Sequence, residues 1–303
     1  MDFQLTEDQK TLETAIEGLA ARFKEKPIEF HGFALVSDEL DRELAEAEFF
    51  DIAAIPDLGP ISAALAVERL ARLPFTAEIA LSMLVRPHLG DGALPRPFAI
   101  IENGRPGRFA ATAKTLLLIE GENVSIAHPE PGDVEPLDSL YAYPMGRAKP
   151  GLKASPLSPD EAKTALAWIR VALAAEAAGL IQAAIASTVE HVSVRKQFGR
   201  PIGAFQALRH RLAECAVLAG GVRLLALKAA ATGDAGDAAL AALHAQESGT
   251  RVVYDAHQML GAMGMTLEHP LHLWTYRLKM LFSELGGRGG QAQAAARYCF
   301  EAA

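Results

Sequence analysis

The strongest constraint on the fold is a long helical pattern that begins at Ser158. Ser158 can cap a helix, Pro159 suits the first helical position, and Glu161 can reach back to the cap. The apolar residues that follow fall on one helical face: Leu166, Ile169, Leu173, Leu180, Ile181 and Ala184. A helix of this length must bury its apolar face against other helices, so the pattern predicts a helical bundle.

The remainder of this segment alternates long helical patterns with short breaks. Breaks are expected at 201–203, 232–237, 261–264 and 286–290, and Pro270 opens a further helix. Long helices joined by short loops predict an antiparallel bundle of four or five helices.

The two segments before this bundle differ from each other in residue pattern. Residues 1–90 predict a helical domain that starts with a capping box at Thr6. Its further helices are expected at 38–50, 60–73 and 75–86.

The middle segment is rich in proline and glycine. Two apolar runs, 115–119 and 124–127, are separated by turn residues and predict a β-hairpin, and 137–143 predicts another strand. The whole chain therefore predicts an α+β fold that is mostly α. Its expected parts are an N-terminal helical domain (1–90), a reduced middle β-domain (91–155) and a C-terminal helical bundle (156–303).

Composition excludes several classes of function. The formal charge of −8 argues against a nucleic-acid partner, and the two cysteines have no metal-ligand spacing, so no metal is expected. The acidic N-terminus does not resemble a signal peptide, and we find no apolar stretch of about eighteen residues. We therefore expect a cytoplasmic protein without membrane insertion.

The most informative local motif is the run from Arg195 to Ile202, which joins two helices. Arg195 can form paired bonds with phosphate oxygens, Phe198 can cover an aromatic face, and Gln197 or Gln206 can bind a polar edge. Spacing alone also fits a charged helix end followed by a tight turn, and His210 and Gln206 fit helix-capping or interface groups equally well.

Here the sequence resembles a known family. The string RKQFGRPIGAFQALRHRLAE resembles the helix-turn-helix signature of acyl-CoA dehydrogenases, which use FAD to desaturate acyl-CoA thioesters. MDFQLTEDQKTL is similar to the first helix of that family, QMLGAMGMT to its glutamine-glycine turn, and TLEHPLHL to the version in short bacterial members. The resemblance extends over most of the chain.

The resemblance implies roles for the matching residues. Arg195 would contact the FAD pyrophosphate of a neighbouring subunit, and Phe198 would lie against the adenine side. The resemblance implies further cofactor-binding residues: Gln197, Gln206, Gln258, Gly261 and Gly264. Absent side chains at the two glycines would let the turn approach the dinucleotide. Ala262 replaces a glycine that is usual there, and Arg170 matches a substrate-side arginine.

The catalytic base is where the resemblance is weakest. The family reaction needs a carboxylate that removes the α-proton of the thioester while hydride leaves the β-carbon. The expected position holds Leu285, with Glu284 one residue earlier, and the second known position holds Ile169. A one-residue slip rotates a helical side chain by about 100°. Glu284 is thus the candidate base, with a solvated helix-end charge as the alternative.

The middle segment lacks the motifs that hold the flavin ring in this family. We therefore expect a subunit that completes the FAD site of a full-length acyl-CoA dehydrogenase, as in heteromeric enzymes of fatty-acid or steroid side-chain β-oxidation. Expected partners are an acyl-CoA substrate and an electron-transfer flavoprotein. The alternatives are a homomeric dimer or tetramer that uses Glu284 as base, and a flavin-free scaffold of the same fold.

Overall fold

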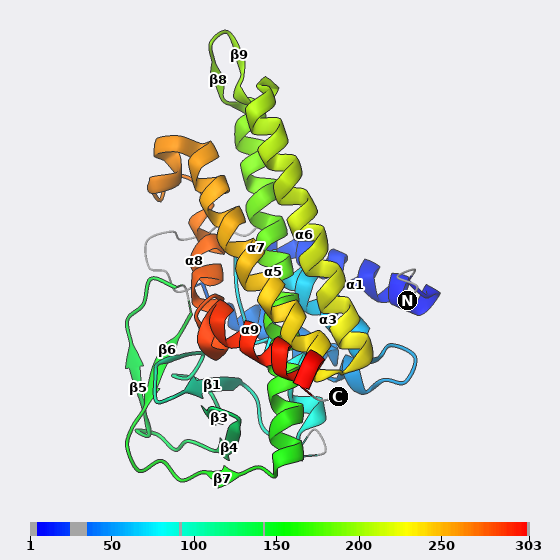
Figure 1. Cartoon of the computed structure of the whole chain (residues 1–303), viewed down its shortest axis with the longest axis vertical. Coiled ribbons are helices and arrows are strands. Elements are labelled where there is room, and N and C mark those ends of the chain that lie inside the picture. The colour runs from blue at the N-terminus through cyan, green and yellow to red at the C-terminus, as the bar shows by residue number, and fades with distance from the viewer. Residues whose placement is uncertain (1–4, 25–34, 91–92, 142, 302–303) are drawn as a thin grey trace.

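A helix of 36 residues, α5 (Pro159–Val194), forms the axis of the molecule (Figure 1). The computed structural model describes residues 5–24, 35–90, 93–141 and 143–301. The predicted start of α5 is confirmed, because Ser158 and Glu161 form a complete capping box. The mostly helical α+β fold is likewise confirmed, with a small β-region attached near the start of α5 (Figure 1).

The C-terminal part is a bundle around α5. Its helices and turns are α5, α6 (Gln206–Thr232), α7 (Ala235–Leu260), α8 (His272–Leu281), α9 (Gly287–Ala296), η4 (Ile202–Ala204), η5 (Gly261–Met265), η6 (Glu284–Gly286) and η7 (Arg297–Glu301). A two-stranded hairpin, β8 (Lys196–Gln197) and β9 (Arg200–Pro201), joins α5 to α6.

Two predicted breaks in the bundle are shorter than expected. Asp234 already caps α7, and its side chain accepts the N–H of Asp237, so the turn before α7 is brief. The stretch 286–290 was expected to separate two helices, but α9 begins at Gly287. A Cβ at Gly290 would lie 2.3 Å from the carbonyl oxygen of Leu285, so glycine serves close packing there rather than a break.

The N-terminal part packs on the bundle through a shared hydrophobic core. Its elements are α1 (Glu7–Lys24), α2 (Asp38–Glu46), η1 (Phe49–Ala54), α3 (Gly59–Ala71), α4 (Ala80–Leu84) and η2 (Arg86–His88). The capping box at Thr6 is confirmed by reciprocal bonds with Gln9. The helix predicted over 75–86 is wrong at its start, because Thr76 pairs with Val36 and only the shorter α4 is helical.

The β-region consists of two small sheets. Its strands are β1 (Phe98–Glu102), β2 (Gly107–Arg108), β3 (Thr115–Glu120), β4 (Asn123–Ala127), β5 (Val134–Leu137), β6 (Met145–Ala148) and β7 (Ser155–Pro156). One sheet has the order β1-β3-β4-β7 and the other β2-β6-β5. The predicted hairpin is confirmed as β3–β4. The strand predicted over 137–143 is wrong beyond Leu137, the last residue of β5, since 138–141 form no strand and Tyr143 is buried before β6 begins; residue 142 lies outside the described residues.

Among the residues that the structure describes, two helices are long and apolar enough to cross a membrane by length and hydropathy alone. The apolar window of α5 is 83% buried within the protein, as expected for the core helix of a bundle, whereas that of α6 is 39% buried. One or two such helices are weak evidence for a membrane span, so the expectation of no membrane insertion stays a prediction.

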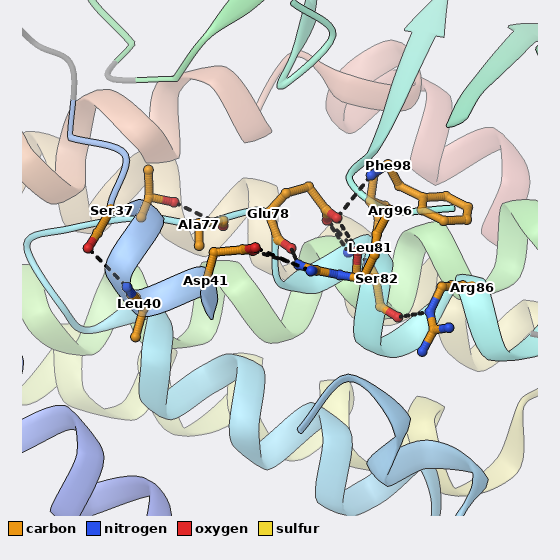
Figure 2. Close-up of polar contacts among 11 residues, drawn as sticks. Ser37, Leu40, Asp41, Ala77, Glu78, Leu81, Ser82, Arg86, Arg96 and Phe98 are labelled. Atoms are coloured by element: carbon orange, nitrogen blue, oxygen red, sulfur yellow. Dashed lines mark hydrogen bonds and ion pairs between the residues drawn. The ribbon is translucent and has the colours of Figure 1, made fainter. Parts of the chain in front are cut away.

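Glu78 joins the N-terminal helices to the first strand (Figure 2). Its carboxylate accepts two N–H groups at the start of α4, at 3.0 and 3.2 Å, and the N–H of Phe98 at 3.1 Å. Arg96 donates to the Glu78 carbonyl at 3.2 Å and to Asp41 at 2.6 Å. One buried carboxylate therefore satisfies donors from two parts of the chain.

Replacing Glu78 by alanine should lower the free energy of unfolding by about 2–4 kcal/mol, because several buried N–H groups lose their acceptor. Urea unfolding measures this loss, and the exposed Glu46→Ala variant should stay within about 0.5 kcal/mol of wild type.

Burial raises the pKa of Glu78 above its ordinary value of 4.5. The folded state therefore holds this proton more tightly, and relative to Glu78→Gln the wild type should lose stability as pH rises above 4.5. Equal stability of the Glu78→Ala and Glu46→Ala variants would contradict the role of Glu78 as the shared hydrogen-bond acceptor.

Candidate functional site

The β8–β9 hairpin lies at the far end of α5 from the β-region (Figure 1). Phe198 sits at its tip, 89% exposed and with a positive φ of 54°. Both features are unfavourable for an aromatic residue in an isolated chain, and such features cluster at binding sites. Arg195 and Gln197 are also exposed on the hairpin. The side chains of the hairpin are thus accessible to a ligand.

Contacts beneath the hairpin fix its shape. The N–H of Ile202 donates to the Arg195 carbonyl at 2.8 Å, which closes the hairpin on the end of α5. The guanidinium of Arg200 lies 4.2 Å from the ring centroid of Phe205. Gln206 contacts His210 at 3.3 Å one turn along α6, so in this chain Gln206 is paired within its own helix.

The turn at the end of α7 contains the other predicted cofactor-side residues. Gln258 and Gly261 are exposed, and Gly261 has a φ of 61° with open space where a side chain would be. Gly264 differs, because it is buried and a Cβ there would lie 2.7 Å from the His257 carbonyl oxygen. The resemblance implied that both glycines let the turn approach a dinucleotide. In the structure, Gly264 instead lets the turn pack closely against the end of α7.

The structure brings the hairpin and the turn to one end of the bundle (Figure 1). His191, near the end of α5, contacts His269 after the turn with ring centroids 5.2 Å apart. Val194 and Met265 are 70% and 84% exposed at the same end. An arginine, two amides and an exposed aromatic ring there suit a phosphate-linked adenine, so these residues fit the ADP half of FAD.

A buried ion cluster lies at the other end of the molecule, between the β-region and the bundle. Arg108 of β2 contacts Glu284 of η6 and Glu176 of α5, both at 2.7 Å. Tyr143 donates its hydroxyl to Glu176 at 2.8 Å. The side chains of Arg108, Glu176 and Glu284 are 3%, 7% and 4% exposed.

One cation in this cluster faces two carboxylates. Burial lowers the pKa of Arg108, but the two glutamates outweigh it and raise that pKa well above its ordinary value. Burial raises the pKa of Glu284 although Arg108 opposes it, and Glu284 Oε2 has no hydrogen-bond partner among the described residues. Burial also raises the pKa of Tyr143, whose hydroxyl stays protonated as a donor to Glu176.

The two base positions lie beside this cluster. Leu285 and Ile169 are 8% and 1% exposed, and neither can take a proton. The alternative that Glu284 is a solvated helix-end charge is wrong, because Glu284 is buried against Arg108. Arg108 bridges β2, α5 and η6 next to Leu285. Neither base position of this chain therefore offers a carboxylate, and the neighbouring Glu284 is held by Arg108.

Arg170 lies next to the base positions, as the resemblance implied. It is 8% exposed, and its Nε donates to Gln291 at 2.9 Å. Burial lowers its pKa. Arg170, Leu285 and Gly286 line a cavity of about 200 Å³ between the bundle and the β-region.

Sequence reasoning missed Arg108, Tyr143, Glu176 and His257. Glu176 could have been suspected, because it is the only charged residue between Arg170 and Glu190 in an otherwise apolar helix. Arg108 and Tyr143 carried no comparable signal, since they lie in a segment of irregular pattern.

Known proteins resemble this chain in sequence and in fold. The family model "Acyl-CoA dehydrogenase, C-terminal domain" matches residues 160–294. Over 122 residues the chain is 38% identical to the acyl-CoA dehydrogenase IpdE2 of Mycobacterium tuberculosis, covering 40% of this chain and 38% of that protein. Glutaryl-CoA dehydrogenase of Desulfococcus multivorans is 38% identical over 108 residues, which cover 34% of this chain and 28% of that protein.

Solved structures match the fold of this chain over almost its whole length. A chain of the ChsE4-ChsE5 complex from Mycobacterium tuberculosis gives a TM-score of 0.80 at 20% identity and covers 99% of both chains. A glutaryl-coenzyme A dehydrogenase bound to glutaryl-CoA gives 0.77 at 20% identity, covering 100% of this chain and 98% of that one. The fold is that of acyl-CoA dehydrogenases, a class of FAD-dependent flavoproteins. In sequence, the match to the acyl-CoA dehydrogenase family covers residues 160–294, which is less than half of the chain.

Proposed function

We propose that this chain is a cytoplasmic subunit of an acyl-CoA dehydrogenase that desaturates an acyl-CoA thioester at the α,β position. In this proposal it completes the FAD site of a full-length partner, which supplies the ring pocket and the catalytic base. An electron-transfer flavoprotein would accept the electrons. The support from relatives is that a chain of a solved complex, ChsE4-ChsE5, has this fold.

One observation carries the proposal. Ile169 and Arg195 lie on the continuous helix α5 and its cap, and roughly 40 Å of helix separates them at about 1.5 Å per residue. That length exceeds an extended dinucleotide. FAD held by Arg195 and Phe198 would therefore not reach this chain's own base positions, which supports a ring position in another subunit.

The residues of this chain would act on the ADP half alone. Bound FAD supplies the acceptor for the hydride that leaves the β-carbon. Arg195 would neutralise pyrophosphate oxygens through charge-assisted bonds, and Phe198 would cover the adenine. Gln258 and Gly261 would line the same surface from the end of α7. These contacts hold and orient the cofactor and move no proton.

Co-expression tests the proposal. The chain should purify without flavin by itself, and with FAD when it is co-expressed with a full-length acyl-CoA dehydrogenase of the same genome. The absorbance spectrum and the ratio of flavin to protein measure the difference. Stoichiometric FAD in the pure homo-oligomer would contradict the proposal, and absence of flavin from every combination would favour the scaffold.

A homomeric enzyme that uses Glu284 is the rival function. The observation in its favour is that Glu284 is buried with a raised pKa and an unpartnered Oε2, as a general base would need. It would have to leave Arg108 before it could reach a thioester.

The Glu284→Gln variant separates the two functions. In the co-purified complex we expect turnover to stay within about twofold of wild type, because the partner holds the base. The rival predicts a loss of about 10²- to 10⁴-fold with flavin retained. The exposed Glu247→Gln variant is the control, and turnover with an artificial electron acceptor is the measurement.

A further inference from the structure

His257 connects three elements at the end of the bundle that carries the cofactor-side turn. It lies in the last turn of α7, half-buried, where its Nδ1 is 2.6 Å from the Gly264 carbonyl oxygen. Its Nε2 is 3.0 Å from the Thr275 hydroxyl of α8. One side chain thus ties η5 to the helix before it and to the helix after it.

The protonation of the ring follows from these partners. The Gly264 carbonyl only accepts, so Nδ1 of His257 carries a proton and donates it. The Thr275 hydroxyl can donate to Nε2, or accept from it while donating to the Leu271 carbonyl at 3.2 Å. Both arrangements keep the bridge intact.

Other contacts to the turn come from Met263, which packs against the apolar cluster of Ala184, Ala256, Leu260 and Leu271, and from the Thr266 hydroxyl, which donates to the Met263 carbonyl. Gly261 takes a positive φ with nothing within 4 Å of its Cβ position, and Ala262 is exposed. Gly264 lies against the His257 backbone and is also the acceptor for its side chain. His257 therefore sets the distance between Gly264 and α7, and with it the shape of the exposed face.

We propose that His257, braced by Thr275, is a positioning residue that holds the Gln258–Gly264 turn in the shape that receives the ADP half of FAD. The inference rests on the function proposed above. A turn that is already ordered loses less conformational entropy on binding, so the brace raises affinity without touching the ligand.

The test compares matched variants in the complex with the full-length partner. His257→Asn removes both bridging bonds and should weaken FAD and ADP binding by about tenfold each. His244→Asn makes the same change elsewhere on α7, where His244 contacts only Ser248 among the polar groups described, and should leave both affinities unchanged. Thr275→Val should weaken binding by about threefold, and Thr275→Ser should restore it.

The readouts are dissociation constants for FAD and for ADP, with the thermal midpoint of the chain alone. Affinities in His257→Asn equal to those in His244→Asn, with a lowered midpoint, would reduce His257 to a structural role and overturn the inference. A wild-type complex that binds neither FAD nor ADP would overturn the proposed function itself. The two failures are therefore distinguishable.

Discussion

Replacing Arg108 by methionine is expected to lower the free energy of unfolding by about 3–5 kcal/mol at neutral pH. The reason is that Glu176 and Glu284 would stay buried as carboxylates without their shared cation. Denaturant unfolding measures the loss. Arg147→Met is the matched control, because Arg147 is exposed on the neighbouring strand β6 and should change stability by less than about 0.5 kcal/mol.

The pH dependence of the Arg108→Met variant has a definite sign. Burial raises the pKa of Glu284, and loss of the opposing Arg108 should raise it further. A carboxyl whose pKa is raised on folding destabilises the protein above its ordinary pKa and not below it. The variant should therefore approach wild type as the pH falls toward the ordinary value of 4.5.

A triple variant separates charge from packing. With Arg108→Met, Glu176→Gln and Glu284→Gln combined, the cluster holds no charge, and most of the lost stability should return. A triple variant as unstable as Arg108→Met alone would show that the shape of Arg108, and not its charge, supports the contact between the β-region and the bundle.

The second large effect is expected at the hairpin. Arg195→Ala should weaken FAD binding by the co-purified complex about 10- to 100-fold, through loss of a charge-assisted contact to the pyrophosphate. Phe198→Gly should weaken FAD by a similar factor, through loss of the ring against adenine. Flavin fluorescence during titration of the apo-complex measures both, and Arg288→Ala at the other end of the bundle is the control.

The stability of the chain alone distinguishes binding from folding at this hairpin. Phe198 is 89% exposed with a positive φ, so glycine should relieve strain and stabilise the isolated chain by up to about 1 kcal/mol. A more stable chain that binds FAD less well is the expected combination. A Phe198→Gly variant that loses stability and keeps FAD would contradict the role of the hairpin.

The starts of two helices and one β-hairpin were predictable because the signals for them are local in the sequence. The capping boxes at Ser158 and Thr6, and the turn between β3 and β4, depend on residues three or four apart, and all three are confirmed. Predictions were wrong where a residue bonds to a partner that lies far away in the sequence. Tyr143 leaves the predicted strand to bind Glu176, and Thr76 leaves the predicted helix to pair with Val36.

By itself, the sequence determined the class of fold, the family resemblance and the motif from Arg195 to Ile202 that joins two helices, since contiguous residues encode them. Only the tertiary structure decided that Arg108, Glu176 and Glu284 form one buried ion cluster, and that His257 contacts both Gly264 and Thr275. These residues are far apart in the chain, and a buried charge is stable only where the fold brings its partner within bonding distance. No local pattern encodes that encounter.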